Sequence, residues 1–175
     1  GLGKSVQLIA LLLSRYQRNT GEMGDGSLGP SLIVCPASLV YNWGAEFTKF
    51  APSFNAVVVA GTKAERRTAI GRAFRADEPT VLITSYDLLR RDVDDYTANE
   101  QRFNVMALDE AQYIKNHTTK IAKAVKAVAA DHRFALTGTP IENRLSELWS
   151  IFDFLMPGLL GSYKRFHERY ELPLS

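Results

Sequence analysis

Short apolar runs alternate along the chain with longer stretches in which apolar residues recur every three or four positions. Runs of the first kind are typical of buried β-strands, and stretches of the second kind are typical of amphipathic helices. The expected strands cover residues 31–35, 56–60, 80–84, 104–108 and 133–136. Because strands and helices alternate, the pattern predicts an α/β fold in which β-α units build a mainly parallel sheet.

The helical spacing is clearest near the N-terminus, where Leu8, Leu11 and Leu12 share one side. The expected helices cover residues 6–18, 38–50, 63–74, 86–91, 118–130, 144–155 and 163–170. Residues 19–30 are rich in glycine and polar side chains, which predicts a flexible surface loop before the first strand. A chain of 175 residues is long enough for one domain with its own hydrophobic core.

The composition, with 46% hydrophobic and 23% charged residues, is ordinary for a globular protein. A net charge of +2 is too close to neutral to indicate a nucleic-acid partner, so any basic surface must be local. Basic side chains gather at 63–75 and 164–169, although such runs are usually solvated helix faces. The longest apolar stretch, 8–13, is far too short to span a bilayer, and no signal peptide is recognisable. We therefore expect an intracellular protein without a membrane partner.

The single cysteine excludes a disulfide framework and a cysteine-based metal site, and the three scattered histidines show no metal-ligand spacing. Cys35 lies at the end of the apolar run 32–35, which predicts a buried core thiol. The candidate chemistry of the chain must therefore come from other residue types.

Gly3, Lys4 and Ser5 stand directly before the first expected helix, as in the second half of a phosphate-binding loop. Glycine lets backbone N–H groups approach phosphate oxygens, and the helix N-terminus adds its positive end. Lys4 would reach the β- and γ-phosphates, and the Ser5 hydroxyl would ligate Mg²⁺. Taken alone, a glycine-rich turn that caps a helix explains the motif equally well. Because the chain begins inside this motif without an initiating Met, we expect a truncated start.

An apolar strand farther along the chain ends in two acids, Asp109 and Glu110. Carboxylates in this position lie at the carboxyl edge of a sheet, where α/β proteins bind ligands. Asp109 would hold Mg²⁺, commonly through a water, and Glu110 would orient and deprotonate the attacking water. An acidic helix start is the alternative. The combination with an upstream Gly-Lys-Ser favours the catalytic interpretation.

The segment Thr137-Gly138-Thr139-Pro140 follows the last expected strand. The threonine hydroxyls at this strand edge could hydrogen-bond to the acid pair and sense the γ-phosphate. Considered by itself, the segment is more simply a polar turn with Gly and Pro.

Five strings of residues occur in one order along nearly the whole chain. They are Gly1 to Gln7; Ile33 to Trp43 with Glu46 and Phe47; Ile83 to Asp87; Leu108 to Gln112 with Ile114 to Asn116; and Leu136 to Asn143 with Glu147 to Ser150 and Phe152 to Leu155. In order and approximate spacing they resemble the motifs of the Swi/Snf family of helicase superfamily 2, whose members move along double-stranded DNA using ATP. Five strings in a shared order are far more specific than any one of them.

The resemblance implies that residues 1–175 form the N-terminal RecA-like ATPase lobe of a DNA translocase or remodeller, a three-layer P-loop domain. It implies ATP and Mg²⁺ as cofactors, double-stranded DNA as a partner bound without regard to sequence, and a second RecA-like lobe in the parent chain. The implied nucleotide-binding residues are Gly1, Leu2, Gly3, Lys4, Ser5, Thr137 and Thr139. The implied metal ligands are Ser5 and Asp109, and the implied catalytic residues are Lys4, Glu110 and Gln112.

The resemblance further implies that the DNA backbone is contacted by Pro36, Ser38, Thr84, Ser85 and Lys115. Hydroxyls, helix-start N–H groups and lysine can hold phosphates without reading bases. For Trp43 and Trp149 we expect core packing rather than base stacking.

Two features depart from many members of the resembled family. Gln112, in an Asp-Glu-Ala-Gln box, stands where many members carry His; an amide can still bridge the acid motif to Thr137 or Thr139, but it cannot titrate. This glutamine and the ending 157–162 indicate a bacterial-type member located in the cytoplasm or nucleoid, whereas a eukaryotic member would be nuclear.

Neither the segment that grips the adenine in relatives nor the second lobe with its arginines lies within this sequence. We therefore expect residues 1–175 alone to bind nucleotide weakly and to be nearly inactive as an ATPase. A non-catalytic scaffold for nucleotide or DNA and a strand-separating helicase lobe are the alternatives. A small P-loop kinase would need a second-substrate site and a lid, and neither is recognisable.

Overall fold

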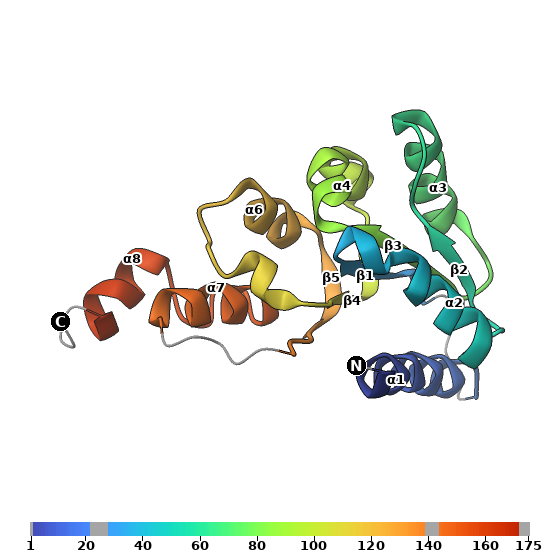
Figure 1. The fold of residues 1–175 in the computed structure, drawn as a ribbon, viewed down its shortest axis with the longest axis horizontal. Helices are drawn as coiled ribbons and strands as arrows, with labels where there is room; N and C mark the ends of the chain where they lie inside the picture. The colour runs from blue at the N-terminus through green and yellow to red at the C-terminus, as the bar shows by residue number, and fades with distance from the viewer. Residues whose placement is uncertain (1, 22–27, 139–143, 172–175) are drawn as a thin grey trace.

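The computed structural model describes residues 2–21, 28–138 and 144–171. Its centre is one five-stranded sheet with the order β2-β3-β1-β4-β5, and every pairing in it is parallel (Figure 1). The strands are β1 (Ser31–Cys35), β2 (Asn55–Val58), β3 (Thr80–Ser85), β4 (Phe103–Leu108) and β5 (Ala130–Ala135). The prediction of an α/β fold with a parallel sheet is confirmed.

Helices connect the strands and cover both faces of the sheet. They are α1 (Leu2–Gly21), α2 (Val40–Phe50), α3 (Lys63–Arg75), α4 (Tyr86–Arg91), α5 (Val93–Thr97), α6 (Lys120–Ala127), α7 (Leu145–Leu155) and α8 (Tyr163–Phe166). Short 3-10 turns occupy Ala37–Leu39, Ala98–Glu100 and Ala111–Ile114, and a π turn follows α8 at His167–Glu171.

The three layers follow from the alternation of side chains along the strands. Ile33 and Cys35 of β1 pack in one core with the buried residues of α1 and α2. Leu32 and Val34 pack in a second core with buried residues of α3 to α7. Figure 1 shows α1 on one side of the sheet and α4 and α6 on the other. Because β1, β3 and β4 are buried along their whole length, apolar residues fill most of their positions and their sequences do not alternate between apolar and polar.

Some boundaries differ from the sequence prediction. The helix expected over 118–130 ends at Ala127, and β5 begins at Ala130 instead of 133. Val128 already has an extended backbone, with φ −73° and ψ 126°, and Ala130 pairs with Phe103 of β4. The strand expected over 56–60 covers Asn55–Val58, and α5 was not predicted. Half of the expected loop at 19–30, namely residues 22–27, lies outside the described residues, and residues 19–21 belong to α1 instead.

The unpredicted helix α5 is tied to α3 by a buried carboxylate, that of Asp92. Arg66 Nε donates to Asp92 Oδ2 at 2.7 Å, and Arg66 Nη2 donates to Oδ1 at 3.0 Å. Lys63 Nζ adds a contact of 2.8 Å to Oδ1. Burial alone would raise the pKa of Asp92, but the hydrogen bonds from Arg66 and Lys63 outweigh burial and lower that pKa. The pair therefore folds as a charged, hydrogen-bonded unit.

Substitution Asp92→Asn should destabilise the domain by about 3–5 kcal/mol, because Arg66 would stay buried without its charged partner. The effect should be seen in urea unfolding as a lower midpoint with an unchanged slope. The matched control is Asp87→Asn, since Asp87 pairs with Arg90 at the surface with 53% of its side chain exposed. That control should shift the urea midpoint little, because exposed ion pairs contribute little to stability. Equal costs for the two variants would contradict the structural role of Asp92.

The same pair makes a pH-dependent contribution. A carboxyl whose pKa is lowered by folding stabilises the native state at pH above its ordinary pKa. This stabilisation is lost as pH falls through the lowered pKa of the folded state. The Asp92→Asn variant should lack this part of the acid sensitivity.

Candidate functional site

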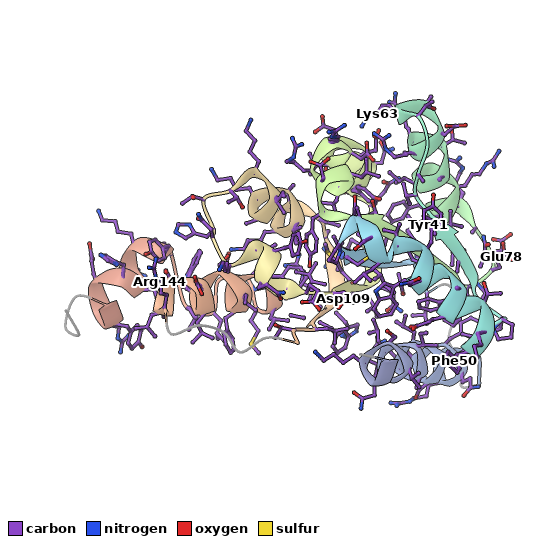
Figure 2. The ribbon with its side chains drawn as sticks, viewed as in Figure 1. Tyr41, Phe50, Lys63, Glu78, Asp109 and Arg144 are labelled. Atoms are coloured by element: carbon purple, nitrogen blue, oxygen red, sulfur yellow. The ribbon has the colours of Figure 1, made fainter. Side chains whose placement is uncertain are left out.

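The acid pair lies at the carboxyl edge of the sheet, where β4 ends (Figure 2). The Asp109 backbone N–H donates to the Val34 carbonyl at 2.8 Å, which ties it to the end of β1. The Ala111 N–H donates to the Leu136 carbonyl at 2.9 Å, which ties the following turn to the segment after β5. Backbone hydrogen bonds thus fix the acid pair between the ends of two neighbouring strands.

Lys4 and Glu110 meet at Gly138, although they come from distant parts of the sequence. A Cβ placed on Gly138 would lie 3.3 Å from Lys4 Nζ and 3.8 Å from Glu110 Oε1. The glycine therefore leaves open a space that both the ammonium of Lys4 and the carboxylate of Glu110 border. Lys4 and Ser5 belong to the first turn of α1, whose N-terminal N–H groups have no partners within the helix. A helix N-terminus beside a lysine is a site suited to anions.

Gln112 joins the acid pair to the segment after β5. Its Nε2 donates to Glu110 Oε2, and its Oε1 accepts a hydrogen bond of 3.2 Å from Thr137 Oγ1. This is the amide bridge expected for Gln112 and Thr137. Thr139, the other threonine considered, lies outside the described residues.

Glu110 has a left-handed backbone, with φ 54° and ψ 56°. This conformation is uncommon for a residue with a long side chain and persists only where the surroundings enforce it. Here the Tyr86 hydroxyl donates to the Asp109 carbonyl at 2.6 Å, on the peptide that precedes Glu110. The Ala111 N–H is held by Leu136 on the other side. Such enforced conformations concentrate at functional sites.

The side chain of Asp109 has a partner that the sequence analysis missed. Trp43 Nε1 donates to Asp109 Oδ2 at 2.9 Å. Trp43 is buried, as expected for a core residue, and Trp149 is buried too. The only signal in the sequence is general: a buried indole N–H usually finds an acceptor. Which acceptor it finds depends on the three-dimensional packing of α2.

Two neighbours of Asp109 stay neutral. Burial, with the charge of Asp109 as a smaller cause, raises the pKa of Cys35 to about 12. Burial and then the same charge also raise the pKa of Tyr86 far above its ordinary value. Cys35 is fully buried, so the prediction of a buried core thiol is confirmed. Tyr86 remains a hydrogen-bond donor throughout the physiological range.

The residues expected to face DNA do not share one environment. Ser38 lies exposed in the 3-10 turn after β1, next to the half-buried Pro36. The Lys115 side chain is 52% exposed, and its Nζ lies 3.8 Å from Glu147 Oε1.

Thr84 and Ser85, in contrast, are buried, with 0% and 4% of their surface exposed. The Ser85 hydroxyl accepts a hydrogen bond of 3.2 Å from the Leu88 N–H and so caps α4. Both hydroxyls are therefore closed to a DNA backbone in this structure, and their contact with DNA stays a prediction. The Ser85 hydroxyl is engaged in the cap because α4 begins at Tyr86, directly after β3.

Arg133 and Arg144, which flank the segment after β5, do not complete the site. Arg133 donates to the carbonyls of Phe154 and Val128 at 3.0 and 2.7 Å, so its guanidinium ties β5 to α7. Arg144 lines a separate surface groove that also contains Lys115 and His117.

The described residues contain no cluster of three or more His, Cys, Asp or Glu side chains that could enclose a metal ion. Mg²⁺ does not need such an enclosure, because in nucleotide sites one or two protein oxygens and the phosphates hold it. The half-buried Asp109 offers its Oδ1, which accepts no hydrogen bond within the described part of the chain. A carboxylate oxygen and the hydroxyl of Ser5 fit the chemistry of that ion. Within the same residues, no helix is long and apolar enough to cross a membrane.

Comparison with known proteins gives a consistent result. The model of the SNF2-related domain matches residues 1–175. The chain is 44% identical to the TATA-binding protein-associated factor MOT1 of Saccharomyces cerevisiae, over 100% of the chain and 9% of that protein. It is 46% identical to an uncharacterized ATP-dependent helicase of Mycoplasma pneumoniae, over 98% of the chain and 15% of the relative. The chain thus spans a small part of the length of these relatives.

Among solved structures, the chain is similar to the SWI2/SNF2 ATPase core of Sulfolobus solfataricus in complex with double-stranded DNA. The TM-score is 0.80 with 40% sequence identity, over 99% of this chain and 33% of the other. The similar proteins come from yeast, a mycoplasma and Sulfolobus, so a bacterial origin stays a prediction.

Proposed function

This chain belongs to the SNF2-related domain family, and from that membership we propose that it is the ATP-binding and hydrolysing lobe of a motor that moves along double-stranded DNA. The resemblance to the Swi/Snf family and the RecA-like fold are both confirmed. The observation that carries the proposal is the meeting of Lys4, Glu110 and Gly138 at one edge of the sheet. Neither a scaffold nor a purely structural turn requires an ammonium and a carboxylate to converge there.

Lys4 and the start of α1 form the phosphate site in this proposal. A Cβ added to Gly3 would meet nothing within 4 Å, so packing among the described residues does not require glycine there. Close approach of a phosphate to the backbone does favour glycine. Gly1 lies outside the described residues, and for Leu2 only the backbone is described. Both remain proposed phosphate contacts.

Glu110 is the residue that would take a proton from the attacking water. Its Oε2 accepts from Gln112, which leaves Oε1 facing the space beside Gly138. Gln112 and Thr137 would hold the carboxylate in this orientation and connect it to the segment that senses the γ-phosphate. When bound, Mg²⁺ would neutralise phosphate charge, and Asp109 and Ser5 are the residues proposed to hold it.

Double-stranded DNA is the proposed partner, and the second RecA-like lobe is proposed to lie elsewhere in the same protein. The similar Sulfolobus core was solved in complex with double-stranded DNA. In this chain the exposed Ser38 and Lys115, with the backbone near Pro36, are the proposed phosphate contacts. Such contacts carry no base information and weaken as salt rises. A DNA partner would place the protein in a bacterial nucleoid or a eukaryotic nucleus.

Replacement of Lys4 by alanine tests the phosphate site. The variant Lys4→Ala should weaken ATP binding on the order of 10- to 100-fold, the effect of losing a charge-assisted hydrogen bond. Binding of a fluorescent ATP analogue to the full-length protein measures it. The control is Lys49→Ala, because Lys49 is exposed on α2, where its ammonium lies over the Phe50 ring. If Lys4→Ala and Lys49→Ala bind the analogue equally well, Lys4 does not contact phosphate and the proposed site is wrong.

A further inference from the structure

Trp43 is held rigidly at the point where its indole N–H meets Asp109. The residue is 3% exposed and lies in the core formed by α1, α2 and one face of the sheet. The ring of Phe47 packs against it with centroids 6.4 Å apart. In a close-packed core a side chain of this size has little room to change its rotamer. The indole N–H that donates to Asp109 Oδ2 at 2.9 Å is therefore held in a fixed position.

The backbone of Asp109 is fixed as well. Its N–H is bound to the Val34 carbonyl at 2.8 Å, and its carbonyl accepts from the Tyr86 hydroxyl at 2.6 Å. Rotation of the side chain is then the principal freedom left to this residue. The indole N–H limits that rotation, because it retains Oδ2 and leaves Oδ1 for a ligand. A carboxylate with one oxygen bound to a rigid donor is pre-organised for a cation at the other.

The contact is not a general property of buried tryptophans in this chain. The other tryptophan, Trp149, is also buried, and its Nε1 has no hydrogen-bond partner among the described residues. Trp149 instead packs edge-on against Tyr163 and lies below the Lys126 ammonium. The fold can thus bury an indole without an acceptor. The acceptor of Trp43 is the carboxylate proposed to hold the magnesium ion.

We propose that Trp43 is a positioning residue that sets the orientation of the Asp109 carboxylate for the nucleotide-bound magnesium ion. This inference rests on the proposed function, because it assigns Asp109 to the metal. It makes α2, a helix outside the phosphate loop and the acid motif, part of the support of the nucleotide site. Trp43 itself touches neither nucleotide nor metal in this proposal.

The test is the substitution Trp43→Phe in the full-length protein, which keeps an aromatic ring in the core and removes the donor. We expect the Mg²⁺ concentration that half-saturates tight binding of a fluorescent ATP analogue to rise about 10-fold, the effect of losing one hydrogen bond to a charged group. Binding of the analogue in excess chelator should stay unchanged. A merely structural role would lower Tm without this selective change in the Mg²⁺ requirement.

The matched control is Trp149→Phe, which removes the same atoms without removing a hydrogen bond and should leave the Mg²⁺ requirement as in the wild type. If Trp43→Phe does not fold, benzothienylalanine at position 43 replaces only the N–H by sulfur and retains the shape. A wild-type Mg²⁺ requirement in the benzothienylalanine protein, or in a folded Trp43→Phe protein, overturns the proposed role of Trp43 but leaves the proposed function in place. Absence of any Mg²⁺-dependent binding in the wild type instead overturns the proposed function itself.

Discussion

The Glu110→Gln protein is expected to bind ATP normally and to hydrolyse it about 10²- to 10⁴-fold more slowly, the usual contribution of a positioned general base. Glutamine keeps the shape of the side chain and can still interact with Gln112, but its amide cannot accept the proton of the attacking water. Binding should survive because Lys4, rather than Glu110, is proposed to contact the phosphates of the ground state. Phosphate release under saturating ATP and DNA, together with binding of a fluorescent ATP analogue, separates the two effects.

The control for this change is Glu78→Gln. Glu78 is exposed and lies far from Asp109 in the view of Figure 2. Hydrolysis by that variant should equal that of the wild type. Loss of ATP binding in a folded Glu110→Gln protein would contradict the division of roles between Lys4 and Glu110.

Residues 1–175 alone should show almost no DNA-stimulated hydrolysis, whereas a protein that includes the second lobe should be about 10³- to 10⁵-fold faster, the usual effect of an arginine finger. Arg133 cannot supply that group in the structure, since its guanidinium is bound to two main-chain carbonyls. Arg144 lines a separate groove. DNA cannot replace the missing arginine in this proposal, because DNA stimulates hydrolysis by closing two lobes around the nucleotide.

The decisive assay compares phosphate release by residues 1–175 with release by the longer protein, each with and without duplex DNA. The similar Sulfolobus core is about three times as long as this chain, which makes the longer protein the natural comparison. Equal DNA-stimulated turnover by the two would refute the two-lobe hypothesis. The salt dependence of DNA binding by the shorter protein would show whether its contacts are mainly to phosphates.

The central strands were predictable because they are buried on both faces. The run at Ser31–Cys35 has the predicted bounds, since apolar residues fill the strand and polar or turn residues flank it. The edge strand β5 was predicted too short, because Asp131 and His132 are exposed and break the apolar pattern. Helix α5 was missed because its stability depends on Arg66 and Asp92, a pair that forms only when α3 packs beside it.

Part of the site was predictable because α/β proteins bind ligands at the carboxyl ends of their parallel strands. Lys4, Glu110 and Thr137 each stand where a strand or a helix meets the same sheet edge, and the structure brings them together through Gly138 and Gln112. Burial and long-range partners could not be read from the pattern. Thr84 is fully buried although its side chain is polar, and Trp43 reaches Asp109 only through the packing of α2.

The strand order has a consequence for the time course of folding. The central strand β1 pairs with β3 and β4, and both of these strands are synthesised after it. Even the nearer of the two in sequence, β3, places Val81 opposite Ser31, many residues later in the chain. Pairings of this non-local kind are slow to form and leave apolar edges open meanwhile. At about 5–20 residues per second, β1 would wait for several seconds on the ribosome before either neighbour exists. The segment that brings Thr137 to Gln112 follows β5, so the contacts between Thr137, Gln112 and Glu110 can form only after all five strands of this sheet have been synthesised.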